Sequence, residues 1–158
     1  MEAVIDQLSD YELERGKPMP TTVHAAIQTN IAAELKVRYR KQYRVLTEIT
    51  LATQPKDSVP DVALYPYFQL DYQHDTASRT DAPLVAVEII SPSQSLSQMI
   101  EKAGRYFAFG VTSCWIVIPD MKAIAVYSSP TSYQFFMGND VVKDSNVPVE
   151  LPLDVVFD

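Results

Sequence analysis

Residues 84–90 constrain the fold most strongly, because this apolar run contains one acidic side chain. The run has the length of a strand and is rich in β-branched residues, which is typical of a strand covered on both faces. Glu88 lies inside it. An ionised carboxylate in a buried strand is costly unless it meets a cation, a metal ion or several donors. We therefore expect Glu88 to be paired or functional.

A helix is predicted directly after this strand. Pro92 ends the strand, since proline cannot donate to the ladder, and Ser95 and Gln98 have the spacing of a capping box. Lys102 lies beside the apolar stripe of the predicted helix. The residues of that stripe are Leu96, Met99, Ile100, Ala103 and Phe107. This strand–turn–helix unit places Glu88 and Lys102 near each other at the end of a strand.

Length and composition indicate one domain over residues 1–158, since 158 residues with 47% hydrophobic content suffice for a single core. The net charge of −7 argues against a surface that attracts nucleic acid everywhere, although a local basic patch is compatible with it. No apolar run reaches the roughly 18 residues that a membrane span needs. Cys114 is the one cysteine and is expected in the core. We expect a cytoplasmic protein.

The remaining elements are predicted from periodicity and turn residues. A short hairpin or extended lead-in is expected over 8–20, a helix over 22–40 and an antiparallel hairpin over 43–65. Residues 66–83 form a long polar loop, and the tail 147–158 is apolar enough to dock on the body. Further strands are expected over 113–118, 124–127 and 133–137.

Basic residues gather at the end of the first long helix, and two interpretations stay open. A cationic helix C-terminus in contact with water is the simpler one. Contact with nucleic-acid phosphates is the other, favoured by the acidity of the rest of the chain. The cluster consists of Lys36, Arg38, Arg40, Lys41 and Arg44.

Asp61, Glu88 and Lys102 are the candidate catalytic residues, with Glu12 and His24 as further candidates. Two carboxylates at the ends of neighbouring strands form a hard oxygen site suited to Mg²⁺ or Mn²⁺. A nearby lysine stabilises negative charge that develops at phosphorus. Each residue also has a purely structural interpretation: a turn residue for Asp61, an arginine partner for Glu88 and an exposed helix lysine for Lys102.

An ordered set of motifs resembles the Uma-two family of endonucleases, a branch of the PD-(D/E)XK superfamily. The set comprises Pro60-Asp61, Glu88-Ile89-Ile90-Ser91-Pro92-Ser93, Lys102, Tyr106, Gly110-Val111 and Trp115-Ile116-Val117. The resemblance covers nearly the whole chain. It implies a restriction-endonuclease-like α/β fold, with a mixed central sheet, one helix before it and one after the catalytic strand.

The resemblance also implies roles for individual residues. Asp61 and Glu88 would be metal ligands, together with the backbone carbonyl of Ile89 or Ile90. Ile90 occupies the position of the superfamily's lysine, and Lys102 on the next helix would replace it. Glu12, Leu13 and Gly16 resemble part of the family's N-terminal hairpin, and His24 the histidine that opens its first helix. Gln98 and Ile118 depart from the acidic residues expected at their positions.

The predicted function is that of an Mg²⁺- or Mn²⁺-dependent endonuclease that hydrolyses DNA, as a homodimer. The alternative is a catalytically silent nuclease fold that serves as a binding or regulatory module, motivated by the acidity of the chain and by Ile90 and Gln98. A structural oligomerisation domain is a third hypothesis, based on the aromatic residues of the C-terminal half.

Overall fold

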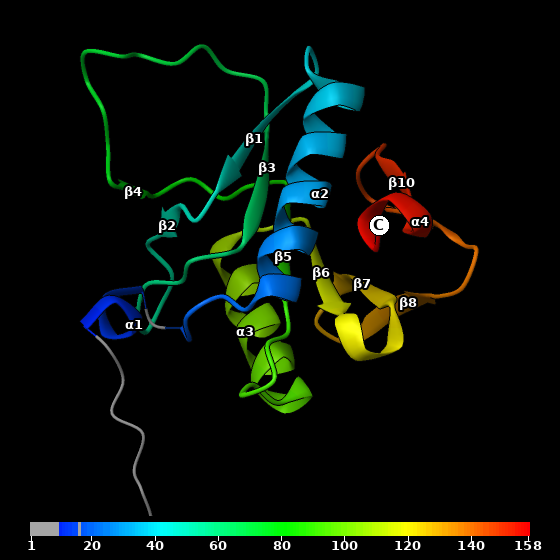
Figure 1. The fold of residues 1–158 in the computed structure, drawn as a ribbon. Coiled ribbons are helices and arrows are strands. Elements are labelled where there is room, and N and C mark those ends of the chain that lie inside the picture. The colour runs from blue at the N-terminus through cyan, green and yellow to red at the C-terminus, as the bar shows by residue number, and fades with distance from the viewer. Residues whose placement is uncertain (1–9, 16) are drawn as a thin grey trace, which may run out of the picture.

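A six-stranded mixed sheet forms the centre of the molecule, as the computed structural model shows for residues 10–15 and 17–158 (Figure 1). The strand order is β1-β3-β5-β6-β7-β8. These strands are β1 (Tyr43–Thr47), β3 (Val62–Pro66), β5 (Val85–Ile89), β6 (Ser113–Ile118), β7 (Ala123–Ser129) and β8 (Ser132–Phe136). Two small sheets pair β2 (Thr50–Leu51) with β4 (Ser78–Arg79) and β9 (Val141–Lys143) with β10 (Glu150–Pro152).

Helices cover both faces of the central sheet. α2 (Thr22–Tyr39) and α4 (Leu153–Val156) pack on one face, and α3 (Leu96–Phe109) packs on the other. The short helix α1 (Asp10–Arg15) and the 3-10 turn η1 (Pro119–Met121) complete the described elements. The β5–α3–β6 unit is a parallel crossover, and the other neighbouring strands of the central sheet are antiparallel. Within the described residues, no helix combines the length and the hydropathy needed to cross a membrane.

The alternation of side chains along β5 divides the core into two layers. Val85, Val87 and Ile89 pack toward α2, whose buried face is formed by Ile27, Ile31 and Leu35. Ala86 packs in the second layer, toward α3. Glu88 has the same parity as Ala86, so its carboxylate is directed to the α3 side of the sheet.

The structure confirms the predicted mixed α/β fold and most of its elements. The helix over 22–40 is α2, and the antiparallel hairpin over 43–65 is the pair β1 and β3. Between β1 and β2 the chain turns at Glu48, whose φ of 57° lies in the left-handed region. The tail also docks, because Leu151, Leu153 and Val156 are buried in the α2 layer.

Two predictions were wrong. The lead-in over 8–20 is not a hairpin in its described part, because residues 10–15 form α1. The stripe of α3 is rotated from the predicted one: Leu96 and Ile100 are 48% and 41% exposed, whereas Lys102 is 8% exposed. The buried face of α3 therefore contains a charged side chain. Its members are Met99, Lys102, Ala103 and Tyr106.

The ends of α3 agree with local sequence signals. Ser95 Oγ accepts a hydrogen bond from the Gln98 backbone N–H, while the Gln98 side chain accepts one from the Ser95 backbone N–H. Gly110 ends the helix with φ 115°, a conformation that glycine adopts at little cost. Fixing both ends sets the register of α3 against β5, and with it the position of Lys102.

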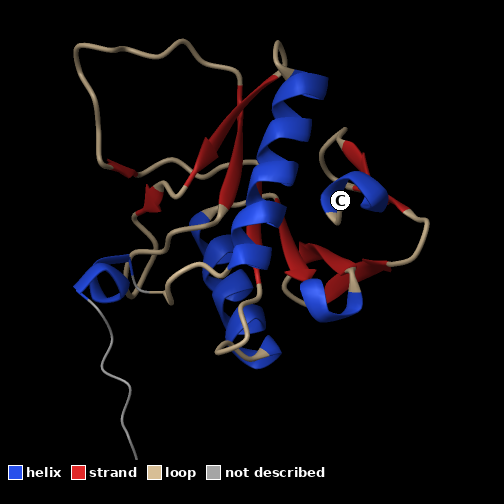
Figure 2. Cartoon of the chain, viewed as in Figure 1, coloured by secondary structure: helices blue, strands red, loops and turns tan. Residues whose placement is uncertain are grey.

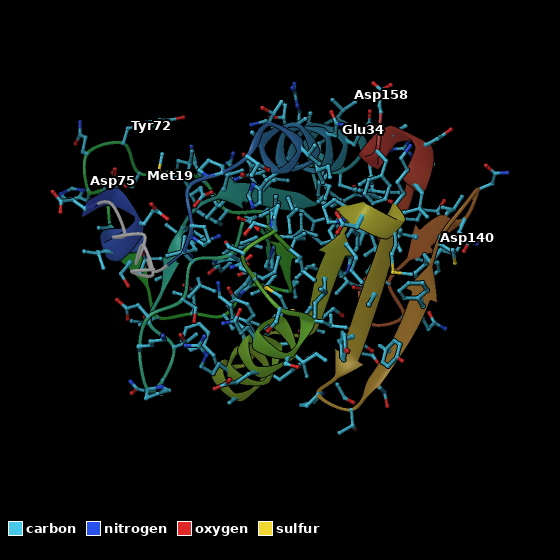
Figure 3. All side chains as sticks on the ribbon, turned by 60° about the horizontal axis from the view of Figure 1, so that its bottom comes forward. Met19, Glu34, Tyr72, Asp75, Asp140 and Asp158 are labelled. Atoms are coloured by element: carbon cyan, nitrogen blue, oxygen red, sulfur yellow. The ribbon has the colours of Figure 1, made fainter. Side chains whose placement is uncertain are left out.

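The long loop between β3 and β4 projects from the body of the molecule (Figure 2). Tyr72 and Asp75 lie on this projection, and Tyr72 is 88% exposed (Figure 3). On another side of the molecule the C-terminus lies along α2, where Glu34 and Asp158 are near each other in Figure 3. Asn30 of α2 donates hydrogen bonds to the carbonyls of Val156 and Asp158 at 3.1 and 3.4 Å.

Candidate active site

Asp61 and Glu88 lie opposite each other on adjacent strands. The antiparallel register of β3 and β5 pairs Val62 with Val87, and continuing it by one residue pairs Asp61 with Glu88. The Asp61 backbone N–H donates to the Val87 carbonyl at 2.9 Å, which fixes this end of β3. Both acidic residues are only 1% exposed. Two buried carboxylates this close together require compensating positive charge.

Among the described residues, the contacts of Asp61 include a backbone donor and the basic side chains of Lys17 and His24. Its Oδ2 accepts a hydrogen bond from the Ile89 backbone N–H at 2.7 Å. Its Oδ1 lies 2.6 Å from Lys17 Nζ and 3.1 Å from His24 Nε2. Burial by itself raises the pKa of Asp61, but the hydrogen bond from His24 and the charge of Lys17 outweigh it and lower the pKa to about 2. Asp61 is therefore ionised at neutral pH.

Glu88 uses its two oxygens differently. Oε1 lies 2.9 Å from Lys102 Nζ and accepts a short hydrogen bond from the Tyr106 hydroxyl. Oε2 faces Lys17 Nζ at 4.0 Å. Burial and the negative charge of Glu88 raise the pKa of Tyr106 well above its ordinary value of 10.0, so the hydroxyl keeps its proton and donates it. One oxygen of Glu88 is thus held by α3, while the other faces Lys17, which also contacts Asp61.

Lys17 joins the two carboxylates, and sequence reasoning did not select it. The side chain is 7% exposed, and its ammonium is within 4.0 Å of Asp61, Glu88 and Glu48. Burial lowers the pKa of Lys17, but the charges of Glu88 and Asp61 more than offset this and raise the pKa above 10.5. Lys17 is thus a buried cation at the centre of the site.

Gln28 and Glu48 form a further layer that sequence reasoning also missed. Gln28 Nε2 donates to the Asp61 carbonyl at 2.9 Å and to Glu48 Oε1 at 3.2 Å. Glu48 reaches this position because the backbone turns at its positive φ, between β1 and β2. A sequence signal exists for Gln28, which follows His24 by one helical turn, but not for Glu48, whose left-handed backbone is not marked by a glycine.

A cleft of about 650 Å³ opens beside the carboxylates. Glu12, Lys17 and Lys102 contribute to its wall, so Glu12 lies near the predicted site although it is not among the contacts of Asp61 given above. Arg105 also lines the cleft, and its buried Nε has no hydrogen-bond partner among the described residues. The remaining lining residues are Leu13, Pro18, Pro55, Lys56, Asp57, Ser58, Val59, Ser93, Gln94, Gln98, Met99 and Glu101.

The predicted basic cluster lies at the other end of α2. His24 is in the first turn of this helix, and Lys36 is twelve residues later, which at 1.5 Å per residue is about 18 Å along the axis. Arg38 pairs with Glu34 at 3.1 Å, and Arg44 donates to the Phe68 carbonyl at 2.8 Å. Lys36, Arg40 and Arg44 help to line a separate hollow of about 320 Å³. The cluster and the cleft are therefore separate surfaces.

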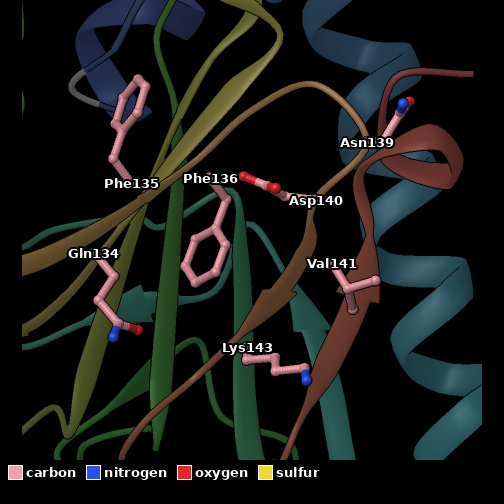
Figure 4. A pocket seen from close by; sticks show the side chains of 7 residues that line it. All are labelled: Gln134, Phe135, Phe136, Asn139, Asp140, Val141 and Lys143. Atoms are coloured by element: carbon pink, nitrogen blue, oxygen red, sulfur yellow. The ribbon is translucent and has the colours of Figure 1, made fainter.

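A third hollow, of about 700 Å³, lies between β8 and β9 (Figure 4). Its lining includes Phe135, Phe136, Asp140 and Lys143. Two strands, β6 and β7, separate β8 from the strand that holds Glu88. This hollow is therefore remote from the buried carboxylates.

The donor set of the site suits a hard divalent cation. Asp61 Oδ1 and Glu88 Oε2 face one shared position, at which the Lys17 ammonium already acts as a cation. Among the described residues, no group of three or more His, Cys, Asp or Glu side chains is arranged to hold a metal ion. Mg²⁺ commonly binds through one or two carboxylates and keeps several waters, so two carboxylates suffice. The Ile90 backbone N–H donates to the Val117 carbonyl, and the predicted role of the Ile90 carbonyl stays a prediction.

Comparisons with known proteins agree with the fold. The family model of Uma2 (Uma-two), described as "Putative restriction endonuclease", matches residues 5–155. A crystal structure described as a putative nuclease belonging to DUF820, from Anabaena variabilis ATCC 29413, superposes with a TM-score of 0.75 at 22% sequence identity. The match covers 89% of this chain and 83% of that one. No curated protein sequence matches this chain.

Proposed function

The chain belongs to the Uma2 family, and on this basis we propose that it is a divalent-metal-dependent nuclease that hydrolyses phosphodiester bonds in DNA. The observation that supports this most strongly is the pair of buried carboxylates, Asp61 and Glu88, facing one shared cation position beside an open cleft. Lys102 bonded to Glu88 completes the set of residue types that phosphodiester hydrolysis requires.

Asp61 and Glu88 are proposed to hold the metal ion, Mg²⁺ or Mn²⁺. When bound, such an ion polarises a phosphoryl oxygen and makes water a better nucleophile. Lys102 fixes the orientation of Glu88 through Oε1, and its position at the cleft lets its positive charge act on a phosphate there. His24 holds Asp61 Oδ1 at 3.1 Å and orients that carboxylate. Glu12, on the cleft wall, is proposed to assist.

The cleft is the proposed site of the DNA backbone. Arg105 offers a buried donor without a partner among the described residues, and Lys56 lines the same cleft. Both groups suit phosphate oxygens. The cluster at the end of α2 (Lys36, Arg38, Arg40, Lys41 and Arg44) stays a predicted second contact with phosphates, at a distance from the cleft. The homodimer and the cytoplasmic location also stay predictions from sequence.

A silent binding module is the second candidate, and a particular feature of the site favours it. The described residues contain no group of three metal-ligating side chains, and Ile90 stands where a lysine is usual in the superfamily. This candidate predicts DNA binding in the cleft without hydrolysis. It conflicts with the cost of burying Asp61 and Glu88 together, which a binding surface does not need.

Cleavage of supercoiled plasmid in Mg²⁺ or Mn²⁺ tests the proposal. We expect Asp61→Asn and Glu88→Gln each to reduce cleavage at least 100-fold, because each removes the charge of one proposed metal ligand. Asp120→Asn, which changes an exposed carboxylate on η1, is the matched control and should cleave at the wild-type rate. Equal cleavage by the wild type and all three variants would refute the assignment of Asp61 and Glu88 as metal ligands. Binding without cleavage by the wild type would favour the silent module.

A further inference from the structure

We propose that Lys17 is an internal occupant of the cation site, and that a divalent cation must displace its ammonium in order to bind between Asp61 and Glu88. Displaced, Lys17 becomes a substrate-binding side chain of the cleft. This inference rests on the proposed function, because it takes Asp61 and Glu88 as the metal ligands.

The contacts of the two carboxylates define a single position for a cation. Asp61 Oδ2 is engaged by the Ile89 backbone N–H, and Glu88 Oε1 by Lys102 and Tyr106. The other two oxygens, Asp61 Oδ1 and Glu88 Oε2, lie 2.6 and 4.0 Å from the same Lys17 Nζ atom, and Oδ1 is also 3.1 Å from His24 Nε2. Any ion that ligates both oxygens therefore takes the place of the ammonium.

Electrostatic repulsion makes the two occupants mutually exclusive. A divalent ion and an ammonium in one buried position repel each other strongly, because the surroundings of the site screen charge poorly. Asp61 and Glu88 are each 1% exposed, so little water is available to separate the two cations. In the absence of metal, Lys17 supplies the positive charge that the buried carboxylates need.

The chain around Lys17 allows the side chain to leave. Met19 is 50% exposed and Val23 is 56% exposed, and the residues between them are also exposed, so few contacts hold this connection between α1 and α2. Lys17 also lines the cleft, next to Pro18. A short movement away from Asp61 therefore brings the ammonium into the space proposed for DNA phosphates, where a cation is useful.

Binding of Mn²⁺ alone, measured by titration calorimetry on the full chain without DNA, tests the proposal. We expect Lys17→Met to bind Mn²⁺ at least tenfold more tightly than the wild type, because the competing cation is gone. Lys102→Met is the matched control: it removes the same charge, but from Glu88 Oε1 rather than from the shared position. The increase in Mn²⁺ affinity caused by Lys102→Met should be clearly smaller than the increase caused by Lys17→Met. Affinity of Lys17→Met equal to or weaker than that of the wild type, or a gain matched by Lys102→Met, would overturn the proposal.

Hydrogen exchange on the wild type provides a second test that needs no variant to fold. Mn²⁺ should increase exchange at residues 17–24, because displacement of Lys17 loosens this segment. Unchanged or slower exchange there, at saturating Mn²⁺, contradicts the proposal.

Comparing Mn²⁺ binding by the wild type, Glu88→Gln and Lys17→Met separates the role of Lys17 from the existence of the metal site. If the wild type binds Mn²⁺ and Glu88→Gln does not, the metal site stands, and the Lys17 results decide the role of Lys17 alone. If Mn²⁺ binds to neither the wild type nor Lys17→Met, the metal site itself is wrong and both proposals fall.

Discussion

The ionised state of Asp61 makes a quantitative prediction about stability and pH. A carboxyl whose pKa falls from 3.8 to about 2 on folding adds about 2 kcal/mol to the free energy of unfolding at neutral pH. Because the pKa is lower in the folded state, this contribution is present above about pH 4 and is lost as the pH falls toward 2. At pH 3 about half of it, roughly 1 kcal/mol, remains.

Comparison of the wild type with Asp61→Asn isolates this contribution. The asparagine cannot ionise, so the difference in unfolding free energy between the two proteins should shrink by about 1 kcal/mol between pH 6 and pH 3. Urea unfolding at several pH values measures it, and the fluorescence of Trp115, the single tryptophan, reports the transition.

The control is Asp120→Asn, which changes an exposed carboxylate outside the site. The difference in unfolding free energy between Asp120→Asn and the wild type should stay nearly constant between pH 6 and pH 3. If the difference in unfolding free energy between the wild type and Asp61→Asn is independent of pH, or grows as the pH falls, the lowered pKa of Asp61 is refuted. Such a result would show that His24 and Lys17 do not hold Asp61 in its charged form.

Two further predictions concern residues outside the carboxylate pair. Asp144 accepts hydrogen bonds from Ser113 Oγ and Trp115 Nε1, both at 2.8 Å, and both donor residues are fully buried. We expect Asp144→Ala to lower the free energy of unfolding by about 2–6 kcal/mol from these two buried donors alone, since each loses its acceptor. Asp144→Asn should lower it less, and equal effects of the two variants in urea unfolding would contradict this. Arg105→Gln should reduce the slope of log binding constant against log salt for duplex DNA by about 1, in fluorescence anisotropy at several salt concentrations, through the loss of one phosphate contact. An unchanged slope would remove Arg105 from the DNA-binding surface.

Sequence reasoning could identify the residues of the site that break a pattern. Glu88 was recognisable because a charge inside an apolar strand needs a partner, and Lys102 because helical spacing placed it near the end of that strand. The structure brings the two together at 2.9 Å. The same periodicity gave the wrong rotation for α3, because a buried lysine counts as polar in any hydrophobic pattern although its partners lie elsewhere in the chain.

Lys17, Gln28 and Glu48 could not be found in this way. Lys17 lies in the connection between α1 and α2, and the described acidic residues that it contacts are all at least 31 positions later in the chain. Glu48 depends on a left-handed backbone turn that no glycine announces. The basic cluster at the end of α2 is separated from the candidate site by most of the length of that helix. Its contact with nucleic-acid phosphates stays a prediction.

The placement of β5 between β3 and β6 also has a consequence during synthesis of the protein on the ribosome. Glu88 is made early, but its strand pairs in parallel with β6, which ends at Ile118. Residues 17, 24, 61, 88 and 102 are therefore synthesised before this partner strand is complete. A nascent chain that ends before Ser113 contains these side chains and the antiparallel pair of β3 and β5, but β5 still lacks its parallel neighbour β6. The strand that carries Glu88 is thus covered along its second edge only after all of these residues have been made.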